Sequence, residues 1–155
     1  MPTTSSPTRT PTEEPSEMFL SDIKVGDSRG LNQNPALTLD GTFYPDSIEV
    51  GCIFGMGKTL APFAVGGYRT FDATIGVNDA DPSPEVQQEI PCTLKILTGT
   101  KVLWQDTVKP SEVKHISFPL QGAARINIEC NLNGPAKGYN VGRYPLGFGS
   151  AKIVR

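Results

Sequence analysis

The sequence predicts an all-β protein with the architecture of a β-sandwich or jelly roll. Many short runs alternate apolar with polar residues, which is the period of a half-buried strand. Turn-forming pairs such as Asp40-Gly41 and Gly66-Gly67 separate these runs at short intervals. No stretch keeps a helical period, and the 16 glycines and 14 prolines disfavour long helices.

Six runs carry the strand pattern clearly, and three more carry it weakly. The turn Thr98-Gly99-Thr100 is so short that the runs on either side of it should form a hairpin. The clear strands are residues 47–54, 68–77, 90–97, 101–108, 114–119 and 124–132. The weaker ones are residues 19–24, 37–39 and 151–154.

The chain is expected to divide into a tether, residues 1–17, and one folded domain, residues 18–155. Twelve of the first seventeen residues are Pro, Thr or Ser, so this segment has too little apolar surface to offset the entropy of ordering it. It also lacks the apolar core of a signal peptide. Thr/Pro spacers join exported modules to an anchor or to another domain, and we therefore expect an extracellular or cell-surface location.

The folded part is electrically neutral, because residues 18–155 hold 13 Lys plus Arg and 13 Asp plus Glu. No basic cluster interleaves with aromatic residues, which argues against nucleic acid and anionic membranes as partners. No apolar run is long enough to insert into a bilayer.

The three cysteines, Cys52, Cys92 and Cys130, each lie in a strand-like run at an apolar position. They are too few for a disulfide framework and too scattered for a zinc site. Two arrangements remain open: three small buried side chains, or one buried disulfide with a thiol left over. The sequence does not choose a pair.

Two segments, residues 78–89 and 133–149, are too long and too polar for simple hairpin turns, and loops of this kind carry function in sandwiches. Sugar recognition needs an aromatic platform and planar polar groups. The expected ligand-binding residues are therefore Tyr139, Asn140, Arg143, Tyr144, Asp79 and Asn34. If Tyr144 is the platform, Tyr144→Ala should abolish glycan binding and leave the melting temperature nearly unchanged. The alternative is that the tyrosines only pin a long loop.

Catalysis is not expected. The single histidine, His115, has the parity of an exposed strand residue, so it has no evident nucleophile to activate. No cofactor is expected either. A structural calcium ion at Asp79 and Asp81 is an alternative, but Asp and Asn also end strands simply as turn formers.

Five segments, in order, resemble the NPCBM/NEW2 family, whose members are related to carbohydrate-binding module family 51. The similarity runs from Met18 to Ile153, nearly the whole folded part. The segments that carry it are Phe19-Leu20-Ser21-Asp22, Leu37-Thr38-Leu39-Asp40-Gly41-Thr42-Phe43-Tyr44, Tyr68-Arg69-Thr70-Phe71-Asp72-Ala73-Thr74-Ile75-Gly76-Val77-Asn78-Asp79, the hairpin 93–104 and Ser150-Ala151-Lys152-Ile153. The resemblance implies a galactose-binding-domain-like β-sandwich that binds a glycan or polysaccharide.

Four positions depart from the family pattern. Gly51 and Cys52 stand where the family has His-Ala, and Phe148 and Ser150 stand where it has Trp and Asp. The resemblance therefore implies a non-catalytic carbohydrate-binding module with an altered sugar site. The alternative is a sensor or protein-interaction domain that keeps the sandwich but has lost the site, with a protein as its partner.

Overall fold

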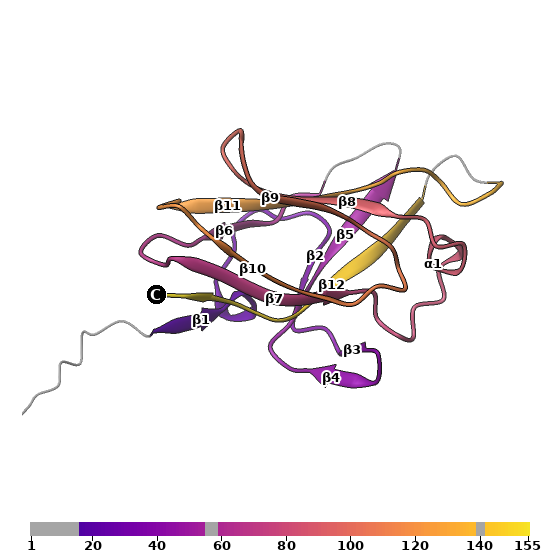
Figure 1. Cartoon of the computed structure of the whole chain (residues 1–155), viewed down its shortest axis with the longest axis horizontal. Helices are drawn as coiled ribbons and strands as arrows, with labels where there is room; N and C mark the ends of the chain where they lie inside the picture. The colour runs from indigo at the N-terminus through magenta and orange to yellow at the C-terminus, as the bar shows by residue number, and fades with distance from the viewer. Residues whose placement is uncertain (1–15, 55–58, 139–141) are drawn as a thin grey trace, which may run out of the picture.

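A computed structural model describes residues 16–54, 59–138 and 142–155. The described chain forms one curled sheet of ten strands and a separate two-stranded hairpin (Figure 1). In Figure 1 the sheet folds over so that β8, β9 and β11 lie above β7, β10 and β12. The all-β sandwich predicted from the sequence is confirmed. No helix among the described residues is long and apolar enough to cross a membrane.

Seven strands form the continuous path of the sheet, in the order β10-β7-β12-β5-β11-β8-β9. All neighbours are antiparallel except β5 and β11, which run parallel and share a single residue pair, Asn131 with Ile53. The strands are β5 (Ile48–Phe54), β7 (Thr70–Gly76), β8 (Cys92–Thr98), β9 (Lys101–Val108), β10 (Lys114–Pro119), β11 (Arg125–Leu132) and β12 (Gly142–Val154).

Three short strands extend this path at its margins. The first, β1, pairs with β12, the second, β2, with β5, and β6 with β11. Their bounds are β1 (Glu17–Phe19), β2 (Leu31–Gln33) and β6 (Pro62–Ala64). The hairpin consists of β3 (Leu37–Leu39) and β4 (Thr42–Tyr44), and two short helical turns complete the chain, η1 (Leu20–Asp22) and α1 (Pro84–Gln87).

The six clear strand predictions match β5, β7, β8, β9, β10 and β11. Two other expectations were wrong. Residues 19–24 form only the end of β1 followed by the 3-10 turn η1. The segment 133–149 was expected to be one long loop, but its second half begins β12, a thirteen-residue strand in the middle of the sheet.

Aromatic and ionic side chains, rather than backbone hydrogen bonds, link the two edge strands of the curled sheet. The ring of Trp104 on β9 stacks on Phe118 of β10, with centroids 5.9 Å apart, and Phe118 stacks in turn on Phe71 at 5.0 Å. Near one end of the seam, Lys114 Nζ lies 3.1 Å from Asp106 Oδ2. Edge strands invite pairing with other chains, and these contacts cover both edges within the same domain.

The glycines of β12 explain why only its last residues, 151–154, were predicted as a strand while its first part was expected to be a loop. The β3–β4 hairpin lies flat on the outer face of β12, where a side chain would normally stand. A Cβ on Gly147 would lie 2.5 Å from Leu37 Cδ1, and one on Gly149 would lie 2.7 Å from Tyr44 Cγ. Glycine lowers strand propensity because it has no side chain to pack, so the sequence of the first part of β12 is typical of a loop. Here the hairpin's own side chains fill the vacant positions.

We predict that Gly147→Ala destabilises the domain by about 1–3 kcal/mol, because overpacking against Leu37 forces the hairpin off the sheet. Chemical denaturation measures the change. Gly66→Ala is the matched control, since its Cβ would meet Ala124 only at 3.8 Å. Equal stability of the two variants would contradict this packing.

Candidate functional site

A concave pocket of about 310 Å³ lies on the outer face of the β5–β12 pair, beyond the hairpin. Most of its wall comes from β5 and β12, with one residue from the segment before β2 and one from the start of α1. The lining residues are Gly30, Glu49, Gly51, Ile53, Ser83, Arg143, Tyr144 and Pro145.

Strand alternation places the pocket residues on the face away from the core. Along β5, Ile48, Val50 and Cys52 are fully buried, so Glu49 and Gly51 point the other way. Gly51 pairs with Pro145 of β12, and its N–H donates to the carbonyl of Gly30 at 2.7 Å. Because Gly51 has no side chain, the backbone itself forms this part of the pocket floor.

At one end of the pocket stands Glu49, which is half-buried. Desolvation raises the pKa of its carboxyl group; the nearby Asp81 carboxylate raises it further, whereas a hydrogen bond from the Asn32 amide lowers it. Asn32 lies opposite Glu49 in the β2–β5 ladder. Neither Glu49 nor Asp81 forms an ion pair among the described residues. The pair Glu49–Asn32 therefore presents a carboxylate beside an amide.

Arg143 stands at the other end of the pocket. It pairs with Ile53 across the β5–β12 ladder, four residues along β5 from Glu49, which is about 13 Å at strand rise. Its side chain is exposed and makes no ion pair within the described residues. The pocket thus has an acidic end and a basic end that do not neutralise each other.

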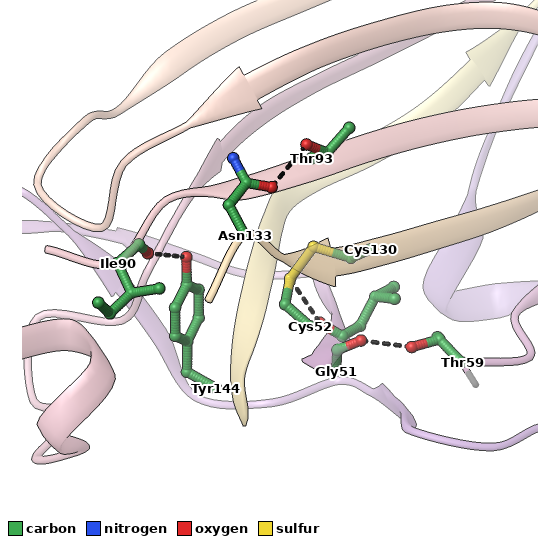
Figure 2. The surroundings of a disulfide bond; sticks show 9 residues. Gly51, Cys52, Thr59, Ile90, Thr93, Cys130, Asn133 and Tyr144 are labelled. Carbon is green, nitrogen blue, oxygen red and sulfur yellow. Dashed lines mark hydrogen bonds between the residues drawn. A yellow bond between two sulfur atoms is a disulfide. The ribbon is translucent and has the colours of Figure 1, made fainter. Parts of the chain in front are cut away.

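Beneath the floor, Cys52 forms a disulfide with Cys130 (Figure 2). Of the two arrangements left open by the sequence, the structure contains the disulfide, with buried Cys92 as the free thiol. The three sulfur atoms all lie within 4.8 Å of one another, which scattered sequence positions could not reveal. Burial raises the pKa of the Cys92 thiol, so this thiol has little tendency to react.

The disulfide joins β5 to β11 where the sheet is weakest. Those two strands share only the pair Asn131 and Ile53, so backbone hydrogen bonds alone connect them poorly. Closing a loop of 78 residues stabilises a domain by about 4 kcal/mol in the chain-entropy treatment. The crosslink therefore holds the floor of the pocket to the opposite layer of the sandwich.

Tyr144 does not present the aromatic platform expected from the sequence. Its side chain is 1% exposed, and its hydroxyl donates to the carbonyl of Ile90 at 2.9 Å (Figure 2). Tyr144 pairs with Cys52 on the core face of the sheet. The alternative interpretation, that this tyrosine pins the chain, describes its side chain, and the expectation of an unchanged melting temperature for Tyr144→Ala no longer holds.

Asp79 and Asp81 organise turns. The Asp79 carboxylate accepts the N–H groups of Asp40 at 2.8 Å and Gly41 at 2.9 Å, which ties the β3–β4 turn to the end of β7. The Asp81 carboxylate accepts the backbone N–H of Ser83 at 2.8 Å and its hydroxyl. The two carboxylates therefore serve different backbone segments. Asp79 instead lines a second, more polar hollow of about 330 Å³ beside Val113.

Three other residues were expected at the site: Asn34, Tyr139 and Asn140. Asn34 is an exposed turn residue with a φ of 63°, and it does not line the pocket. Tyr139 and Asn140 lie outside the described residues. Of the six residues expected from the sequence, the structure therefore places Arg143 and the backbone side of Tyr144 at this pocket.

Sequence analysis missed Glu49 and Ser83. The available signal was the unusual Gly51, which stands where the related family has histidine and which proves to be part of the pocket floor. Its strand neighbours of the same parity share that outer face. By contrast, Phe148, which replaces the family's tryptophan, is fully buried, and Ser150 occupies a bulge with a φ of 47°.

Comparison with solved structures shows the same fold. The chain is similar to a Clostridium perfringens ZmpB structure that holds an M60 catalytic domain with two CBM51 domains (TM-score 0.64, 16% identity, 89% of this chain and 15% of that chain). It is similar to CBM51-2 of ZmpB in complex with GlcNAc (TM-score 0.65, 12% identity, 90% of this chain and 31% of that chain). It is also similar to CBM51 from Clostridium perfringens GH95 in complex with methyl-galactose (TM-score 0.61, 13% identity, 89% of this chain and 99% of that chain).

These likenesses establish a CBM51-like, galactose-binding-like fold. The chain spans 15% of the first of these structures, so it corresponds to one module of a longer polypeptide there. No protein-family model matches the chain, and no curated protein matches its sequence.

We predict that Tyr144→Ala lowers the free energy of unfolding by about 3–5 kcal/mol, because it empties a large buried volume. Tyr144→Phe keeps the ring and removes the hydroxyl group, including its hydrogen bond to the carbonyl of Ile90, and should cost about 1 kcal/mol. Denaturant titration separates the two. An unchanged denaturation midpoint for Tyr144→Ala would contradict the burial of this side chain.

Proposed function

We propose that the domain is a non-catalytic carbohydrate-binding module that acts outside the cell and holds a glycan in the pocket over Gly51. The observation that carries the proposal is the concave outer face of β5 and β12, where Glu49 and Arg143 both lack an ionic partner among the residues that the structure describes. The fold is shared with modules whose structures contain methyl-galactose or GlcNAc. That likeness supports a sugar as the class of ligand.

The pocket offers both kinds of contact that a sugar ring needs. Ile53 and Pro145 supply an apolar floor beside the bare backbone of Gly51, against which the C–H face of a pyranose can lie. The Glu49 carboxylate and the Asn32 amide stand side by side as acceptor and donor for neighbouring hydroxyl groups. These polar groups fix which hydroxyls the site accepts.

The size of the pocket indicates a short ligand segment and modest affinity. Its volume of about 310 Å³ is at the small end of the range of about 300–1,000 Å³ for ligand sites. No exposed aromatic ring lines it among the described residues. Stacking therefore contributes little, and we expect hydrogen bonds to the terminal units of a polysaccharide to provide the specificity.

A glycan array screened with the purified domain tests the proposal, and Glu49→Gln is the informative variant. The wild type should give reproducible hits, and Glu49→Gln should lose them, since a neutral amide replaces the charged acceptor. Asp72→Asn is the matched control: Asp72 lies two strands away on β7 and does not line the pocket. A silent array for the wild type, with and without calcium, would contradict the proposal.

Glu49→Gln should raise the melting temperature at neutral pH while it removes binding. Because the folded-state pKa of Glu49 lies above its unfolded value, the charged form disfavours folding, and this penalty disappears as pH falls below the unfolded pKa. The gain in melting temperature should therefore shrink as the buffer becomes acidic. A loss of stability at neutral pH would mean that Glu49 is a structural residue.

A further inference from the structure

Among residues 16–54, 59–138 and 142–155, no positively charged side chain pairs with the acidic end of the pocket. Glu49 is half-buried, and within the described part of the chain its side-chain hydrogen bond is to an amide, that of Asn32. Asp81 lies close enough to repel it, and its own carboxylate is occupied by Ser83. Among the described lining residues the one cation is Arg143, whose backbone position pairs with Ile53, four residues along β5 from Glu49.

We propose that this end of the pocket takes a hexosamine unit whose amino group is free, so that the ligand supplies the missing positive charge beside Glu49. The proposal rests on the proposed function, and it names the class of glycan. A partly buried carboxylate keeps unused lone pairs for an ammonium donor, and a charge-assisted hydrogen bond is shorter and stronger than a neutral one.

The same geometry disfavours the acetylated form of the sugar. An acetamido group is neutral and bulkier, so it leaves Glu49 without a counter-charge and must also fit between Glu49 and the pocket floor. A carboxylated or sulfated sugar would have to approach Arg143 instead and keep its charge away from Glu49 and Asp81. The ammonium form satisfies the acidic end directly.

The proposal also sets a window of pH. Binding requires the Glu49 carboxylate to be ionised and the sugar amine to be protonated. The groups that face Glu49 are Asp81 from the segment before α1 and Asn32 from β2, with Arg143 of β12 at the far end of the pocket. Because burial raises the pKa of Glu49, affinity should fall already in mildly acidic buffer. It should fall again when the amine loses its proton.

Calorimetric titration with matched oligosaccharides tests this inference. Fully deacetylated glucosamine oligomers, their N-acetylated counterparts and hyaluronan oligomers are compared at about pH 5, 6 and 7. Because the pKa of Glu49 is raised, the preference for the deacetylated oligomer should be weakest at the acidic end of this range. The deacetylated oligomer should bind the wild type at least about tenfold more tightly than the acetylated one. Glu49→Gln should abolish this preference, and Asp72→Asn should keep it.

Three other titration results would refute either the hexosamine assignment or the proposed function. Equal or tighter binding of the acetylated or hyaluronan oligomers would refute the hexosamine assignment and leave glycan binding intact. A preference that survives in Glu49→Gln would show general attraction of a cation to an acidic protein, and would also refute the assignment. Failure of all three oligomers together with a silent array would refute the proposed function itself.

Discussion

The bare backbone on the outer face of β12 is the constraint on which the rest of this structure depends. Gly147 and Gly149 leave room for Leu37 and Tyr44, so the β3–β4 hairpin can lie directly on the sheet. The hairpin covers only part of the β5–β12 face. Beyond the hairpin the same outer face is uncovered. Because Gly51 has no side chain, the surface there is hollow. The pocket is therefore the part of the outer β5–β12 face that the hairpin does not cover.

The sandwich keeps this face in place through links that differ from an ordinary strand ladder. The parallel junction between β5 and β11 has one residue pair, and the Cys52–Cys130 disulfide reinforces it directly under the pocket. At the opposite seam, the stacked rings of Trp104 and Phe118 join the edge strands. Both links lie in the core layer. They leave the outer face free to vary, which is consistent with a binding surface on a stable frame.

Sequence patterns predicted the architecture well because alternation of side chains carries most of that information. Six strands were located from their period alone. Of β12 only residues 151–154 were predicted, because the glycines in its first part are typical of a loop when the packed hairpin is unknown. The site was harder to predict for the same reason. Tyr144 was expected to be an aromatic residue that binds the ligand. Its position in the alternation of β12 places its side chain on the buried face instead. Glu49 looked like an ordinary polar strand residue, and only the fold shows that Gly51, Ser83 and Arg143 surround the same hollow.

A crystal structure of the domain with a bound oligosaccharide tests the central claim most directly. The account predicts a sugar ring over Gly51, with its polar groups contacting Glu49 and the side chain of Arg143 bordering the same pocket. A ligand seated elsewhere, for example in the polar hollow beside Asp79 and Val113, would contradict it.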